Sequence, residues 1–142
     1  MITKKQKEKK PTKKELEKTR KQQMKKYDAK WSKLVKVKAW YKCEVPWCTK
    51  TSLNSHHIFT RNNRSTRFDL ENWVCLCAWH HTLSSTFSAH KTPTEFGERI
   101  KETRWQERYD NLKRKANTIR DKDYDKIKEY LDTKEKELCK QG

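Results

Sequence analysis

The chain has 142 residues and a net charge of +17, with 36 Lys+Arg against 19 Asp+Glu, and only 32% of its residues are apolar. A chain of this size and polarity buries little apolar surface, so we expect one small domain with basic extensions. The longest apolar run, residues 73–79, is far shorter than the roughly 20 residues that span a bilayer. The start is basic but lacks the apolar segment of a signal peptide. We therefore expect a soluble, cytoplasmic protein with no membrane partner.

Most of the positive charge lies near the start, because residues 1–42 carry a net charge of +13. Thr12 and Glu15 have the spacing of a helix-capping box. Apolar residues follow at helical intervals, namely Met24, Tyr27, Trp31 and Leu34. We expect a disordered basic tail over residues 1–11 and a basic helical arm over residues 12–42, with the helix reaching about residue 39. The charge excess favours a polyanion-binding arm over a helix that only aids solubility.

Two pairs of metal-ligating residues stand about 30 residues apart in the middle of the chain, Cys43 with Cys48 and Cys77 with His80. Two such pairs on tight turns suit a tetrahedral zinc site of three cysteines and one histidine. Thiols inside cells gather around metals more often than they form disulfides. We therefore expect a structural Zn²⁺ that helps to fold a small domain. Cys75 shares a strand face with Cys77, so it either competes as a ligand or packs beneath the site.

The same region holds a second set of polar residues: His56, His57, Asn72, His81 and His90. Adjacent histidines on a strand face opposite sides, so one of His56 and His57 can bind a metal while the other faces a substrate water. The residues alone leave two interpretations open, a second metal site or histidines with structural and surface roles.

The last third of the chain is expected to be helical. Thr92, Pro93 and Glu95 have the pattern of a helix N-terminus. Two apolar faces follow, one of Trp105, Tyr109, Leu112, Ala116 and Ile119, and one, after a break at residues 121–123, of Tyr124, Ile127, Leu131 and Leu138. We expect these faces to cover the middle region or to pair with the N-terminal helix, within one chain or between chains. Both a monomer and a homodimer fit this pattern.

Four aromatic residues lie among lysines, namely Trp31, Trp40, Tyr41 and Trp47. They could stack on unpaired bases, but we expect most of them in the small core.

The run SHHIFTRNNRSTRFDLENWVCLCAWHH resembles the HNH endonuclease motif. The likeness continues into SAHKTPTEFGERI and RYDNLKRKAN, which are similar to the NinG/Rap family of phage recombination nucleases, and it covers roughly residues 20–138. The resemblance implies an α+β fold. A small ββα-metal core over residues 43–92, held together by zinc, would be flanked by the basic N-terminal helix and by C-terminal helices over residues 93–142.

The resemblance also implies a role for each residue of the second set. His57 would be the general base, and His56 and His81 would hold a catalytic divalent cation such as Mg²⁺ or Mn²⁺. Asn72 would fix the loop between strand and helix, and His90, nine residues after His81, is a tentative third ligand. A neutral histidine can take a proton from water, while the cation stabilises the scissile phosphate and the leaving oxygen.

Three arginines at intervals of three residues, Arg61, Arg64 and Arg67, could bind flanking phosphates. We therefore expect a metal-dependent DNA endonuclease, which the resemblance directs to branched recombination intermediates. If a phage encodes the chain, the host cytoplasm is its location. The alternatives are an HNH homing or packaging nickase on duplex DNA, and a non-catalytic zinc-dependent module that binds nucleic acid.

Overall fold

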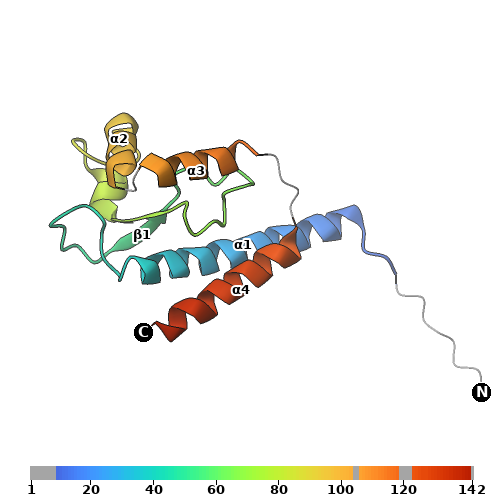
Figure 1. Ribbon diagram of the computed structural model, residues 1–142. Coiled ribbons are helices and arrows are strands. Elements are labelled where there is room, and N and C mark those ends of the chain that lie inside the picture. The colour runs from blue at the N-terminus through green and yellow to red at the C-terminus, as the bar shows by residue number, and fades with distance from the viewer. Residues whose placement is uncertain (1–8, 104–105, 119–122, 142) are drawn as a thin grey trace, which may run out of the picture.

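A computed structural model describes residues 9–103, 106–118 and 123–141 of the chain (Figure 1). It is a mixed α+β structure, as expected. The elements in chain order are α1 (Lys13–Lys38), β1 (Leu53–His56), β2 (Val74–Cys77), the short π-helix η1 (Trp79–Leu83), α2 (Pro93–Thr103), α3 (Gln106–Ala116) and α4 (Tyr124–Lys140). None of the helices in these described ranges has a stretch apolar and long enough to cross a membrane.

Helix α1 begins and ends close to the predicted residues. The Thr12 hydroxyl accepts a hydrogen bond from the Glu15 amide, and the Glu15 carboxylate accepts one from the Thr12 amide at 2.7 Å, which forms the predicted capping box. The second half of α1 buries its apolar face, Tyr27, Trp31, Leu34 and Val35. This half contacts α4 and both strands, so α1 is a core element as well as a basic arm. Its first turns extend past the N-terminal end of α4 (Figure 1).

Strands β1 and β2 pair antiparallel, with Leu53 opposite Cys77 and His56 opposite Val74. Cys75 packs on one side of β2 with α1 residues such as Trp31. Val74 and Leu76 pack on the other side against α2. The short sheet therefore lies between α1 and α2, which are separated in the sequence by residues 39–92.

Helix α2 starts at Pro93 as predicted, but the Thr92 side chain differs from expectation. Its hydroxyl accepts from the Ser88 amide at 2.9 Å and donates to the Ser88 carbonyl, which fixes the preceding loop. Of the next predicted face, Leu112 of α3 is buried. Trp105, Ile119 and residues 121–122 of the predicted break lie outside the described residues.

Helix α4 pairs with α1 within the chain. Asp123 caps its start by accepting from the Lys126 amide at 3.1 Å, and Leu131 is fully buried. The Tyr27 hydroxyl donates to the Tyr124 carbonyl at 3.1 Å, and Lys30 pairs with Glu135 at 2.8 Å. Polar contacts thus flank the apolar seam between the helices.

The aromatic residues divide differently from the prediction. Trp31 is 2% exposed and belongs to the core, but three others are exposed and the expectation that they are core residues is wrong: Trp40, Tyr41 and Trp47. They lie where α1 ends and in the loop beyond it, outside the two apolar clusters of the described chain.

Candidate metal centres and active site

The four residues predicted to bind zinc lie together. Their ligand atoms, one each from Cys43, Cys48, Cys77 and His80, are all within 4.8 Å of one another. The Cys48 and Cys77 sulfurs are 3.7 Å apart, and His80 Nδ1 lies 3.5 Å from the Cys43 sulfur. Tetrahedral zinc, with bonds of about 2.3 Å to sulfur and about 2.0 Å to nitrogen, requires separations of roughly 3.5–3.8 Å. The spacing and the donor set therefore fit one zinc ion.

Backbone hydrogen bonds hold the first ligand loop against the sheet. The Glu44 amide donates to the Cys75 carbonyl, and the Cys75 amide donates to the Glu44 carboxylate, both at 2.9 Å. The Cys48 amide donates to the Val45 carbonyl at 3.2 Å and closes the turn between the two cysteines. Cys75 itself is fully buried, lies outside the cluster and packs in the apolar core with Trp31 of α1.

The protonation of these residues responds to burial. Desolvation raises the pKa of the Cys43 thiol to about 12. Burial also acts to raise the pKa of Cys77, but hydrogen bonds from the His80 amide and the neighbouring thiols outweigh it and lower that pKa. Desolvation lowers the pKa of His80, which favours the neutral imidazole that binds metals. A bound cation would stabilise the Cys43 thiolate, which burial otherwise disfavours.

Three further histidines form a second cluster. The ligand nitrogens of His56, His81 and His90 lie within 4.8 Å of one another, and the Nε2 atoms of His81 and His90 are 3.2 Å apart. The nine-residue interval before His90 closes because the Ala89 amide donates to the His80 carbonyl and the His90 amide to the His81 carbonyl. The structure thus brings His90, which is exposed, to the two partly buried histidines.

Burial favours the neutral form of two of these imidazoles, His56 and His81. Desolvation and the neighbouring histidines lower the pKa of His56 to about 4, and desolvation lowers that of His81. Neutral imidazoles each offer a nitrogen lone pair to a cation. The cluster could therefore hold a metal ion.

His57 faces the opposite way from His56. Its ring stacks on Trp31, with centroids 3.8 Å apart and planes 6° apart. His57 Nε2 lies 2.9 Å from the Arg67 carbonyl. Because a carbonyl only accepts, Nε2 carries the proton and Nδ1 keeps a lone pair. Desolvation lowers the pKa of His57, which keeps the ring neutral near pH 7.

Asn72 is fully buried and fixes the loop that carries His57. Its Oδ1 accepts from the Phe59 amide at 2.7 Å, and its Nδ2 donates to the carbonyls of Phe59 and Thr66 at 2.9 and 3.0 Å. Phe59 follows His57 by two residues, and Thr66 precedes Arg67. The loop fixed in this way joins strand β1 to strand β2; the expectation that it joins strand and helix is wrong.

His57 and the three-histidine cluster open into one cavity of about 570 Å³. It lies between the strand ends, η1 and α2, and its rim includes Arg61. A second hollow of about 220 Å³ follows beside α1, lined by Arg61, Arg64 and Arg67. Arg61 and Arg64 are exposed. A continuous basic path therefore leads from the histidines toward α1.

Arg67 has a different environment from the other two arginines. Its guanidinium makes a two-pronged ion pair with Asp28 of α1, at 2.9 and 2.6 Å. This pair occupies the fork expected to bind phosphate, so Arg67 anchors its loop to α1 while its carbonyl orients His57. Asp28 is the sole acidic residue between Glu17 and Glu44 in the sequence, a signal that could have identified this partner.

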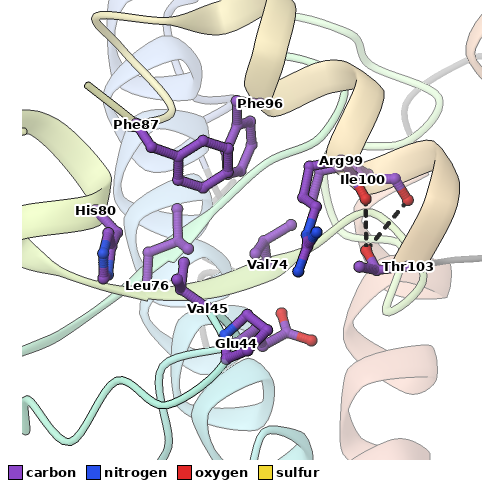
Figure 2. Close-up of a pocket in the computed structure, with 11 residues that line it drawn as sticks. Glu44, Val45, Val74, Leu76, His80, Phe87, Phe96, Arg99, Ile100 and Thr103 are labelled. Carbon is purple, nitrogen blue, oxygen red and sulfur yellow. Dashed lines mark hydrogen bonds between the residues drawn. The ribbon is translucent and has the colours of Figure 1, made fainter. Parts of the chain in front are cut away.

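Another cavity of about 400 Å³ lies between β2, the first ligand loop and α2 (Figure 2). Figure 2 shows Val74, Leu76, Phe87 and Phe96 lining it, with Glu44 and Arg99 toward one end. Its lining is mostly apolar, and the zinc-cluster residue His80 faces it. The grouping of histidines that could act on a phosphodiester lies in the other cavity.

Comparisons of the chain with known protein families, with curated proteins and with solved structures gave no match. The fold and site define a small α+β protein with a Cys₃His cluster that could hold a metal such as zinc.

Proposed function

We propose that the protein is a metal-dependent DNA endonuclease of the HNH, ββα-metal type. The observation that carries this proposal is that a neutral, oriented histidine, His57, and a three-histidine cluster line the same cavity. Phosphodiester hydrolysis needs both a base for water and a positive charge for the phosphate. A purely structural role for His57 would not require it to line the same cavity as a candidate metal site.

The chain's own residues would divide the chemistry as follows. His57 Nδ1 would accept a proton from the attacking water, while Nε2 remains bonded to the Arg67 carbonyl, which also stabilises the resulting imidazolium. Trp31 holds the ring plane, and Asn72 holds both chain segments beside it. A divalent cation bound by His56, His81 and His90 would supply charge stabilisation for the phosphate and the leaving oxygen.

Basic residues would bring DNA to this cavity. Arg61 and Arg64 can contact phosphates on either side of the cut, and the exposed first half of α1 adds lysines along its length. Each neutralised phosphate releases counterions, so affinity should fall steeply with salt. We propose branched recombination intermediates as the preferred substrate, a choice that rests on the resemblance to phage recombination nucleases.

Cleavage assays with matched variants test this function. The zinc-loaded protein is incubated with linear, nicked and four-way-junction DNA, with Mg²⁺, with Mn²⁺ or without added divalent cation. We expect metal-dependent cutting of the junction, reduced by at least about a hundredfold in His57→Ala with little change in DNA affinity. Equal cutting of linear duplex would indicate a duplex nickase. Tight binding without cutting under every condition would indicate a non-catalytic module.

Mn²⁺ binding separates the base from the metal ligands. We expect His57→Ala to bind Mn²⁺ as the wild type does, and His81→Ala to lose that binding together with cleavage. Thr82→Ala is the matched control, because Thr82 is exposed, directly follows His81 and donates its hydroxyl to the Ala78 carbonyl. Mn²⁺ binding that survives in His81→Ala would contradict the assignment of the second cluster.

A further inference from the structure

Four exposed aromatic side chains lie within three residues of a zinc-cluster ligand in the sequence, and we name them the aromatic rim: Trp40 (76% exposed), Tyr41 (60%), Trp47 (99%) and Trp79 (46%). Trp47 precedes the ligand Cys48, and Trp79 precedes the ligand His80. Because those ligand atoms lie within 4.8 Å of one another, the two indoles flank a single centre. Large aromatic side chains left exposed beside one centre indicate a contact surface.

The backbone at Trp40 is one that favours glycine. Helix α1 ends with the Tyr41 amide donating to the Lys36 carbonyl and the Trp40 amide to the Val37 carbonyl, both at 2.9 Å. This is the Schellman arrangement, and Trp40 occupies its left-handed position with φ of 53°. Glycine is usual there because any side chain is crowded by the backbone. Tyr41, with φ of 52°, also has a left-handed backbone.

Trp47 repeats this feature in a different turn. The Cys48 amide donates to the Val45 carbonyl, Pro46 is the second residue of the turn and Trp47, with φ of 63°, is the third. A proline followed by a positive φ defines a type II turn, whose third residue is normally glycine or asparagine. Because the Trp47 side chain is almost fully exposed, it gains no packing energy that could offset this backbone strain.

Folding therefore does not explain these side chains. Trp40, Tyr41 and Trp47 bury little surface, and they occupy positions where the backbone disfavours a side chain. Strain that persists without a packing gain is a feature of functional sites. The inference from the strain is that the rings are held outward to meet a partner.

Charge identifies the chemistry of that partner. Residues 36–50 contain four lysines and one glutamate, and the carboxylate of that Glu44 already accepts from the Cys75 amide. Lys50 lies over the Trp79 ring, 5.2 Å from its centroid. Lysine is depleted in the buried centres of protein interfaces. Aromatic rings interspersed with cations are instead the platform on which bases of single-stranded nucleic acid stack.

We propose that the aromatic rim binds unpaired bases of single-stranded DNA, through stacking on Trp40 and Trp47 and phosphate contacts from nearby lysines such as Lys42. The choice of DNA rests on the proposed nuclease function, which the rim would deepen. Unpaired bases occur at branch points, so the rim would favour branched over fully paired substrates. Binding itself requires neither the second histidine cluster nor cleavage.

Glycine variants test the proposal because they should keep or raise the thermal stability of the protein while they weaken its binding of single-stranded DNA. Trp40→Gly and Trp47→Gly relieve the backbone strain, so the zinc-loaded full chain should unfold at the same or a higher temperature. Each variant should bind a fluorescent oligothymidylate about tenfold more weakly. Affinity for a duplex of equal length should stay the same. Leu16→Ala is the matched control, since it removes an exposed apolar side chain from the other end of α1.

Three outcomes would overturn the proposal. Both variants could bind the single strand as the wild type does, or lose affinity for duplex equally. Sedimentation could instead show a wild-type dimer that the variants dissociate, which would make the rim a dimer interface. The assay is run without added divalent cation, so it is independent of cleavage. Rim-dependent binding by a protein that never cleaves would refute the nuclease proposal and support this one.

Discussion

The imidazole of His57 lies flat on the indole of Trp31, with ring centroids 3.8 Å apart and planes within 6°. Trp31 is in turn fixed, because its Nε1–H donates to the Asp69 carbonyl at 3.1 Å. The basic helix α1 therefore supplies one wall of the candidate active site. Orientation of the base depends on a helix that precedes the histidine motif in the sequence.

Trp31→Leu tests this dependence. Loss of the stack should let the His57 ring turn, so single-turnover cleavage should slow by about tenfold to a hundredfold with DNA affinity nearly unchanged. The smaller side chain should also lower the free energy of unfolding by about 3 kcal/mol, so cleavage is measured well below the melting temperature. Trp31→Phe, which keeps a ring to stack on, should recover most of the rate. A Trp31→Leu protein that cleaves at the wild-type rate would contradict the role of the stack.

Asn72→Ala should affect both stability and cleavage. It leaves the buried Phe59 amide and two carbonyls without their partner, which should cost about 2–3 kcal/mol of unfolding free energy. The loop beside His57 would loosen, and cleavage should fall by about a hundredfold or more. Asn63→Ala is a matched control, because Asn63 makes comparable hydrogen bonds in the same loop, to Ser65, Thr66 and Ala116. Equal rate losses in the two variants would show that Asn72 acts only through general stability.

Cys77→Ser should release the structural metal. Apparent binding energies of about 10–16 kcal/mol are typical of structural zinc in small domains, so the variant should contain no zinc and should lose its cooperative thermal transition. Cys139→Ser is the matched control, since Cys139 is exposed on α4 and lies outside the cluster. Metal analysis beside calorimetry provides the readout. A folded, fully zinc-loaded Cys77→Ser protein would refute the predicted ligand set.

Tyr130 should make stability fall at alkaline pH. Burial raises its pKa to about 12, although the Leu70 amide, which donates to its hydroxyl at 3.1 Å, acts to lower it. The unfolded chain has a tyrosine pKa of about 10, so the contribution is complete below pH 10 and is lost as pH rises toward 12. Tyr130→Phe lacks this loss, so its unfolding curve should converge with that of the wild type over this range. Parallel stability profiles would contradict the docking of α4 on the loop.

Local patterns in the sequence predicted the elements and ligand pairs that depend on neighbouring residues. The capping box at Thr12, the helix start at Pro93 and the grouping of Cys43 and Cys48 with Cys77 and His80 are confirmed. Contacts between distant segments could not be predicted from such local patterns. The apolar stripe that contains Trp31 is typical of a core helix, and nothing in the sequence indicates that Trp31 stacks on His57.

The left-handed backbone conformations of Trp40 and Trp47 could not be predicted from residue composition either. Aromatic residues beside lysines predicted a core, because aromatic burial is the usual outcome. Trp40 and Trp47 instead lie in left-handed positions that turn them to solvent. The pairing of Arg67 with Asp28 likewise removes from the phosphate path an arginine that spacing alone placed there.

Chemical rescue of His57→Ala tests the central claim most directly. Removing the side chain leaves a space beside the Trp31 ring and the Arg67 carbonyl, which free imidazole can fill with the same stacking and hydrogen bond. Single-turnover cleavage of junction DNA in Mn²⁺ should be lost in His57→Ala and restored, in proportion to concentration, by added imidazole. Two results would contradict the assignment of His57 as the general base of a nuclease. One is cleavage by His57→Ala at the wild-type rate without added imidazole. The other is that the wild type does not cleave with any divalent cation.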